Sequence, residues 1–259
     1  MRTTDDLIHY TREGTGDPLV LVHGVGANLA SWDGVAERLK GEFDILRSDL
    51  RGHGESARID SPITIDTFAE DILRVMDEQG VESAHLAGFS LGGLITQRLA
   101  VGWPDRFRRI VILSAVAGRT PEERAKVTDR LGMIRDGGMK AITGAARDRW
   151  FTEGFARDNP DLITRRIAEM EAAHVPSYLE AYRVFGQTEL VDTLHQIKHP
   201  ALIMTGELDQ GSNPRMARTM HELIDGSELE ILPGLKHSVL LEASDLIAER
   251  IAAFLKKPL

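Results

Sequence analysis

The sequence contains no cysteine, no excess of basic residues and no long apolar run. The absence of cysteine excludes disulfides, thiolate metal sites and a cysteine nucleophile, and it suits a reducing compartment. The net charge is −9, whereas nucleic-acid binding normally requires a basic surface. No apolar stretch is long enough to span a membrane, and the N-terminus lacks the pattern of a signal peptide. We therefore expect a cytoplasmic protein with no nucleic-acid or membrane partner.

Strand-like and helix-like segments alternate over the first half of the chain and again near its end. The expected strands cover residues 7–10, 19–22, 43–47, 84–89, 110–113, 201–205 and 229–232. The expected helices include residues 65–76, 91–100 and 243–255. Such alternation is typical of a mostly parallel central sheet with helices on both faces. The predicted fold class is therefore α/β.

The segment from residue 119 to residue 198 contains helical patterns but no convincing strand. In its first helix, Thr120 can cap the N-terminus and Glu123 completes a capping box. Glycines at 137 and 138 end this helix, and shorter helical pieces follow. We therefore predict a core domain made of residues 1–118 and 199–259, interrupted by a helical cap at 119–198.

The residues Gly88-Phe89-Ser90-Leu91-Gly92 match the pattern G-x-S-x-G between an expected strand and an expected helix. A serine on such a sharp turn exposes its hydroxyl oxygen, and the flanking glycines let the backbone pass closely. Ser90 is therefore predicted to be a nucleophile. The alternative is a glycine-rich turn with an incidental serine, but the position between a strand and a helix favours the catalytic interpretation.

A serine hydroxyl needs a base within hydrogen-bond reach and an acid that orients the base. His237 follows the last expected strand, in a loop that can reach the C-terminal edge of the sheet. Asp209 and Glu207 follow the strand before it, in the order that the fold requires of the acid. We predict Asp209 as the acid, with Glu207 as its competitor. A structural role as a loop-capping aspartate is the alternative for Asp209.

Acyl transfer also needs hydrogen-bond donors for the oxyanion that develops on the substrate carbonyl. The amide of Leu91 directly follows the nucleophile and is the first candidate. The second candidate is the amide of Val25, in the loop His23-Gly24-Val25-Gly26 after the first long strand. A plain glycine turn is the alternative interpretation of this loop.

Several groups of residues make the chain resemble the α/β-hydrolase superfamily over its whole length. They are His23-Gly24 with Trp32, residues 49–56, the Ser90 turn with Gly92-Gly93, residues 206–209 with Pro214, and residues 234–237. The resemblance implies the α/β-hydrolase fold with an inserted helical cap. Within the superfamily, the chain is most similar to 3-oxoadipate enol-lactonases and related ring-cleavage-product hydrolases. Arg149-Trp150-Phe151 and residues 232–238 carry this closer likeness.

The resemblance implies that the chain hydrolyses a small carboxylic ester or lactone through an acyl-enzyme, without a cofactor. No histidine and acid cluster has metal-ligand spacing such as H-E-x-x-H, so no metal site is expected. Dehalogenases and epoxide hydrolases of this fold carry an aspartate where Ser90 stands. Ser238 stands where carbon–carbon bond hydrolases commonly have Trp, so cleavage of a carbon–carbon or amide bond in a ring-cleavage product is the second hypothesis. A non-catalytic binding protein is the third, and the intact order of serine, acid and histidine disfavours it.

The expected partner is a small-molecule substrate, and the sequence is compatible with a homo-oligomer. The predicted cap carries thirteen basic and thirteen acidic residues, so the rest of the chain carries the whole net charge of −9. The cap should lie over the C-terminal edge of the sheet, where open α/β sheets bind ligands. We therefore hypothesise a carboxylate-bearing substrate, with Trp150 as an apolar wall and Arg149 or Arg135 as the cation. Alternatively, the arginines form solvated pairs along helices and Trp150 belongs to the core of the cap.

Overall fold

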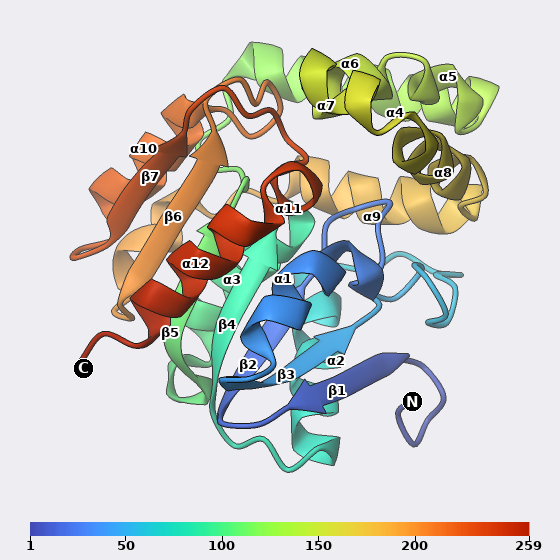
Figure 1. The fold of residues 1–259 in the computed structure, drawn as a ribbon. Helices are drawn as coiled ribbons and strands as arrows, with labels where there is room; N and C mark the ends of the chain where they lie inside the picture. Colours follow the sequence, from blue (N-terminus) through green and yellow to red (C-terminus); the bar gives the residue numbers. More distant parts are fainter. Residues whose placement is uncertain (259) are drawn as a thin grey trace.

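The computed structural model describes residues 1–258 and contains a seven-stranded sheet (Figure 1). The strands are β1 (Tyr10–Gly14), β2 (Asp17–Val22), β3 (Phe43–Ser48), β4 (Ala84–Phe89), β5 (Phe107–Leu113), β6 (Ala201–Gly206) and β7 (Glu228–Leu232). Their order across the sheet is β1-β3-β2-β4-β5-β6-β7. Neighbouring strands are parallel, except that β1 pairs antiparallel with β3 at one edge. The predicted α/β class with a mostly parallel sheet is therefore confirmed.

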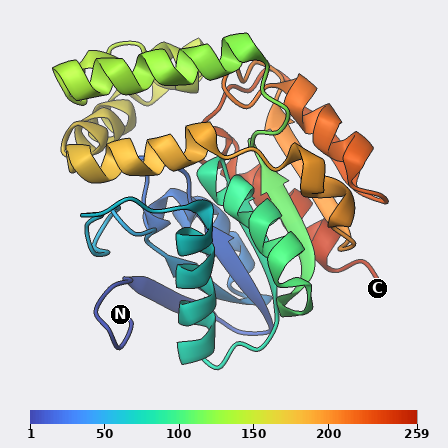
Figure 2. The ribbon, with the colours of Figure 1, turned by 180° about the vertical axis from the view of Figure 1, so that it is seen from behind.

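Helices cover both faces of the sheet, as Figures 1 and 2 show from opposite sides. They are α1 (Asp33–Leu39), α2 (Ile65–Glu78), α3 (Leu91–Gly102), α10 (Pro214–Leu223), α11 (Val239–Glu242) and α12 (Ser244–Leu255). On β2, Leu19 and Leu21 pack toward α1 and α12, whereas Val20 and Val22 pack toward α2, α3 and α10. The strand is continuously apolar because both of its faces are buried. No helix within residues 1–258 combines the length and the apolar character that crossing a bilayer requires.

Six helices lie between β5 and β6, and they cross above the C-terminal ends of the strands (Figure 2). They are α4 (Pro121–Gly137), α5 (Lys140–Thr143), α6 (Ala146–Trp150), α7 (Glu153–Asp158), α8 (Pro160–Glu171) and α9 (Val175–Gln187). We call these six helices the cap. A short 3-10 helix, η3 (Val191–Gln196), follows, and its Leu194 belongs to the apolar cluster formed mainly by residues of the sheet and of α2, α3 and α10. The last residues of the predicted segment 119–198 therefore contact the core.

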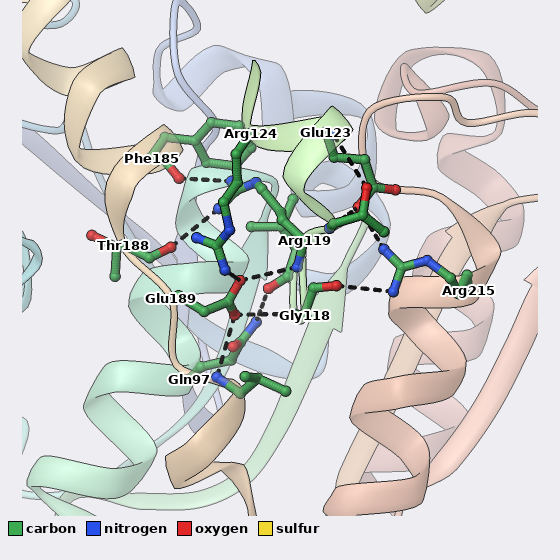
Figure 3. Close-up of polar contacts among 12 residues, drawn as sticks. Gln97, Gly118, Arg119, Glu123, Arg124, Phe185, Thr188, Glu189 and Arg215 are labelled. Atoms are coloured by element: carbon green, nitrogen blue, oxygen red, sulfur yellow. Dashed lines mark hydrogen bonds and ion pairs between the residues drawn. The ribbon is translucent and has the colours of Figure 1, made fainter. Parts of the chain in front are cut away.

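The segments that enter and leave the cap are joined at Glu189 (Figure 3). The Glu189 carboxylate accepts hydrogen bonds from the amides of Gly118 and Arg119, at 2.9 and 3.0 Å. The Arg119 guanidinium donates to the carbonyl oxygens of Phe185 and Thr188, at 2.7 and 3.1 Å. These carbonyls lie at the end of α9, where a helix leaves carbonyl groups without partners of their own. The two connections thus fix the base of the cap above the sheet edge.

The structure agrees with the predicted start of α4 and differs from the predicted position of the edge strand. Thr120 Oγ1 accepts from the Glu123 amide at 3.2 Å, and the Glu123 carboxylate accepts from the Thr120 amide at 2.8 Å. The predicted capping box is therefore present. The edge strand was expected at residues 7–10, but β1 begins only at Tyr10. Thr3 and Ile8 hydrogen-bond each other, at 2.9 and 3.0 Å, and this contact holds the preceding residues in a turn.

Candidate active site

Ser90 occupies a sharp turn between β4 and α3. Its backbone angles are φ 55° and ψ −112°, a left-handed conformation that costs free energy for any residue except glycine. The Ser90 amide donates to the Leu113 carbonyl on the neighbouring strand at 2.9 Å, and this bond holds the turn. Glycine is required at position 92, because a Cβ there would lie 2.2 Å from the Val22 carbonyl oxygen. The backbone around Ser90 therefore has the strained geometry that exposes a nucleophile.

Asp209 and His237 are joined by a hydrogen bond of 2.6 Å between Asp209 Oδ2 and His237 Nδ1. Asp209 follows β6 and His237 follows β7, and these strands are neighbours in the sheet. The amides of Gly211 and Ser212 donate to Asp209 Oδ1, each at 2.9 Å. An ionised carboxylate only accepts hydrogen bonds, so the neutral His237 ring carries its hydrogen on Nδ1. Nε2 of His237 is then free to accept a proton.

Glu207, the competing acid, lies on the same loop but makes a different contact. Its side chain is exposed, and its carboxylate accepts from the Gly234 amide at 2.9 Å. Asp209 lines the central cavity of the protein, whereas Glu207 is not among the residues that line it. The geometry therefore favours Asp209 over Glu207 as the partner of the histidine.

The loop after β2 passes directly beside Ser90, because β2 and β4 are neighbouring strands. A Cβ added to Gly24 would lie only 2.9 Å from Ser90 Cβ. Val25 follows Gly24 and lines the cavity. Leu91 is the first residue of α3, where helix amides have no acceptor within the helix. Within residues 1–258, neither the Val25 amide nor the Leu91 amide has a hydrogen-bond acceptor, so both are available to a ligand.

The buried ring of His23 fixes the peptide between Gly24 and Val25. The Leu50 amide donates to His23 Nε2 at 2.9 Å, so Nδ1 carries the hydrogen and donates to the Gly24 carbonyl at 2.7 Å. Burial and, to a smaller extent, the neighbouring His53 lower the pKa of His23, which keeps the ring neutral. A trans peptide directs its carbonyl and its amide to opposite sides. Holding the Gly24 carbonyl therefore also orients the Val25 amide.

A cavity of about 610 Å³ lies between these loops and the cap. Ser90, Asp209 and His237 line it from the core, while α4, α6, α8 and α9 supply residues from above. The cavity lies beyond the carboxyl ends of β2 and β4, where the strand order reverses direction, and open α/β sheets bind ligands at this point. Its volume is within the range of small-molecule sites, roughly 300–1,000 Å³.

The predicted cap residues have different positions. Arg149 and Trp150 both line the cavity, and Trp150 also packs against the two apolar clusters of the cap. Trp150 thus contributes to the cavity wall and to the packing of the cap. Arg135 does not line the cavity: its side chain is 72% exposed, and its Nε donates to Asp136 at 3.1 Å. The structure therefore corrects the suggestion that Arg135 faces a substrate.

Comparison with known protein families matches residues 19–250 to the family described as the alpha/beta hydrolase family. The chain belongs to this family. It is a hydrolase, and the fold class expected from the resemblance is confirmed.

Curated relatives and a solved structure agree with this assignment. The hydrolase is 29% identical to (E)-2-((N-methylformamido)methylene)succinate hydrolase of Acinetobacter baylyi, covering 96% of its own length and 94% of the relative. It is 26% identical to 3-oxoadipate enol-lactonase 2 of the same organism, covering 98% and 94%. The crystal structure of the enol-lactonase from Burkholderia xenovorans LB400 has a TM-score of 0.91 at 26% identity and covers 98% of each chain. The predicted resemblance to enol-lactonases is therefore confirmed.

Three further arginines of this hydrolase line the cavity, namely Arg119, Arg130 and Arg166, and no local sequence pattern had marked them. Arg130 on α4 lies over the ring of Tyr182, 5.5 Å from its centroid. Arg166 on α8 donates to the Gly26 carbonyl and to Glu169. Which charged side chains face the cavity therefore depends on the rotation of each cap helix about its own axis.

Buried histidines of this hydrolase predict a loss of stability in acid. Burial lowers the pKa of His53 to about 4 and that of His85 to about 4. In the unfolded chain these groups titrate near 6.5, so the unfolded state binds more protons between about pH 6.5 and pH 4. The free energy of unfolding should therefore fall as the pH decreases through this window.

Chemical denaturation at a series of pH values measures this effect. His85→Leu removes one of these buried titrating groups and should give a shallower dependence on pH than the wild type. A free energy of unfolding that stays constant through the same window would contradict the prediction.

Proposed function

We propose that this hydrolase cleaves a small carboxylic ester or lactone through a serine acyl-enzyme, with Ser90, His237 and Asp209 as a catalytic triad. One observation carries the proposal: the strained Ser90 turn and the hydrogen-bonded Asp209–His237 pair border the same cavity. A left-handed backbone at a non-glycine residue is costly and persists where the surrounding structure holds it, which is common at active sites. The relatives named as enol-lactonases support the same chemistry.

In the acylation step, Ser90 Oγ attacks the carbonyl carbon of the substrate while His237 Nε2 accepts the hydroxyl proton. Asp209 accepts from Nδ1 throughout and stabilises the imidazolium that forms. The amides of Val25 and Leu91 donate to the oxyanion of the tetrahedral intermediate. His237 then returns the proton to the leaving oxygen, so the carbon–oxygen bond of the ester breaks and the acyl-enzyme remains.

Deacylation repeats these steps with water in place of Ser90. His237 takes a proton from water as the water oxygen adds to the acyl carbon. The proton then returns to Ser90 Oγ as the bond between the acyl carbon and the serine oxygen breaks. In a lactone the leaving oxygen remains part of the acyl group, so a single ring-opened acid is released. The chain and water supply every group that these steps use.

Arg149 and Arg130 support a substrate that carries a carboxylate. Both residues line the cavity, and neither side chain has an ion-pair or hydrogen-bond partner within residues 1–258. Burial lowers the pKa of Arg149, and the nearby charge of Arg130 lowers it further, while Tyr182, Tyr178 and Asp209 oppose the shift. Arg149 is thus within electrostatic reach of both Arg130 and Asp209. A carboxylate bound between the two arginines would relieve their repulsion and can accept two hydrogen bonds from a guanidinium.

The names of two relatives agree with an anionic substrate. One is named for a succinate and the other for a 3-oxoadipate, and both of these are dicarboxylates. The name of the succinate hydrolase also contains an N-methylformamido group. Hydrolysis of an amide group carried by a dicarboxylate is therefore the second candidate reaction, with the same nucleophile and the same anion site.

Substrate charge is expected to control the specificity of the enzyme. The wild type should have a higher kcat/KM for a carboxylate-bearing lactone than for its methyl ester. Arg149→Ala and Arg130→Ala should each reduce this preference by about 10- to 100-fold, the effect of losing a hydrogen bond to a charged group. The loss should appear mainly in KM, because the carboxylate is bound equally in the ground and transition states.

Arg135→Ala is the matched control, because Arg135 belongs to the same helix as Arg130 but points to solvent. This variant should leave unchanged the ratio of kcat/KM for the carboxylate-bearing lactone to kcat/KM for its methyl ester. If the methyl ester is the better substrate of every variant, the anionic-substrate proposal fails and a general esterase remains. A higher kcat/KM for an amide analogue than for the lactone would select the second candidate reaction.

A further inference from the structure

The cap contacts the loop after β2 at Gly26. Arg166 on α8 donates from Nη2 to the Gly26 carbonyl, and its Nη1 lies 3.3 Å from the Glu169 carboxylate. The Arg166 side chain is only 17% exposed, whereas that of Glu169 is 57% exposed. A largely buried guanidinium with a solvent-facing partner is costly to maintain. Its bond to Gly26 is therefore a candidate for a functional contact.

Residues 24–27 form a β-turn that carries the predicted oxyanion donor. The Ala27 amide donates to the Gly24 carbonyl at 3.3 Å and closes the turn. Gly26 has a φ of 67°, as the third residue of a type II turn requires, and Val25 is the second residue. The Gly26 carbonyl and the Ala27 amide belong to one peptide unit. Arg166 therefore holds the same peptide that closes the turn around Val25.

A second cap helix contacts the same glycine. A Cβ added at Gly26 would lie 2.6 Å from Cε2 of Tyr178 on α9. Tyr178 is itself buried among the apolar residues of the cap. The turn thus lies between His23 of the core, which holds the Gly24 carbonyl, and two cap helices at Gly26.

We infer that Arg166 is a positioning residue: its bond to the Gly26 carbonyl keeps the Val25 amide directed at the oxyanion. This inference rests on the proposed function, because it takes Val25 as an oxyanion donor. Misplacing a catalytic group by about 1 Å can cost on the order of 100-fold in rate. The cap would then contribute to the chemical step as well as to substrate binding.

Two other roles for Arg166 make different predictions. Arg166 lines the main cavity and also a neighbouring cavity of about 190 Å³, so it could bind a substrate carboxylate or separate the two spaces. A carboxylate-binding arginine affects anionic substrates alone. A separating side chain affects KM and the accepted substrate size. A positioning residue lowers kcat for every substrate, including a small neutral ester.

Arg166→Met removes the guanidinium donors and keeps an unbranched side chain. We expect kcat to fall roughly 10- to 100-fold on both p-nitrophenyl acetate and a carboxylate-bearing lactone, with KM for the neutral ester unchanged. Phenylboronic acid forms a tetrahedral serine adduct that occupies the oxyanion site, so its affinity should fall by a similar factor. Arg166→Lys retains one donor and should recover part of both losses. Arg157→Met changes an exposed arginine of the cap that lines neither cavity, so it is the control and should match the wild type.

Wild-type kcat on p-nitrophenyl acetate in Arg166→Met would overturn the inference, whatever happens with the anionic lactone. If this variant does not fold, Gly26→Ala displaces the same turn and leaves every charge in place. It should show the same losses of kcat and of boronic acid affinity, and wild-type values there would also overturn the inference. The proposed function fails separately, if turnover survives Ser90→Ala. If turnover requires Ser90 but not Arg166, only the positioning role is excluded.

Discussion

Replacing Ser90 with alanine is expected to abolish hydrolysis while leaving the fold intact. Loss of the nucleophile in a serine protease costs on the order of 10⁶ in kcat, and we expect a loss of that size here. The Ser90 hydroxyl has no hydrogen-bond partner within residues 1–258, so alanine leaves no buried group unpaired. The hydrogen bond that holds the turn is donated by the Ser90 amide to the Leu113 carbonyl, and alanine keeps this amide.

Turnover of an ester and labelling by a fluorophosphonate probe measure the role of Ser90. The wild type should react with the probe at Ser90, whereas Ser90→Ala should be neither labelled nor active. Ser238 is another hydroxyl that borders the cavity, so Ser238→Ala tests whether the loss is specific to position 90. Turnover close to the wild-type value in Ser90→Ala would remove the basis of the acyl-enzyme mechanism.

The sequence predicts which residues of the core lie together at the candidate site, because its signals are local or follow chain order. The turn at Ser90 is specified by glycines within two residues of it and by the adjoining strand and helix. His237 and Asp209 follow strands that are consecutive in the chain and adjacent in the sheet, so a parallel α/β fold brings them together. The expected strands 84–89 and 201–205 differ from β4 and β6 by at most one residue. Buried strands have clear apolar limits, which makes their bounds predictable.

The cap is less predictable, because the sequence does not show which face of each amphipathic cap helix lies toward the cavity. Arg130 and Arg135 both lie on α4, and five residues turn a helix by about 140° beyond one full turn. One of the two therefore faces the cavity when the other faces solvent, but the sequence alone does not say which. The equal numbers of basic and acidic residues in the predicted cap also do not show what each side chain contacts. Arg119 is hydrogen-bonded to carbonyl groups at the cap base and Arg166 to Gly26, so only some of the basic side chains are free for a ligand.

Asp209→Asn is expected to lower kcat by on the order of 10⁴, as the corresponding change does in a serine protease. The asparagine can still accept from Gly211 and Ser212 through its carbonyl oxygen. Its amide nitrogen would then face His237 Nδ1, which could no longer donate there. The ring would be held with its hydrogen on Nε2, and that nitrogen could not take the Ser90 proton. The measurement is kcat on an ester, with thermal unfolding as a check that the variant folds.

Glu207→Gln is the matched control for this change, because it neutralises an acid on the same loop. Glu207 accepts a single hydrogen bond from the Gly234 amide, and a glutamine oxygen can accept the same bond. Its kcat should therefore stay close to the wild-type value. If Glu207→Gln instead loses more activity than Asp209→Asn, the contact between Asp209 and His237 is structural and the acid has been assigned to the wrong carboxylate. If both variants keep full activity, His237 works without an orienting acid, and the buried carboxylate serves mainly to hold the amides of Gly211 and Ser212.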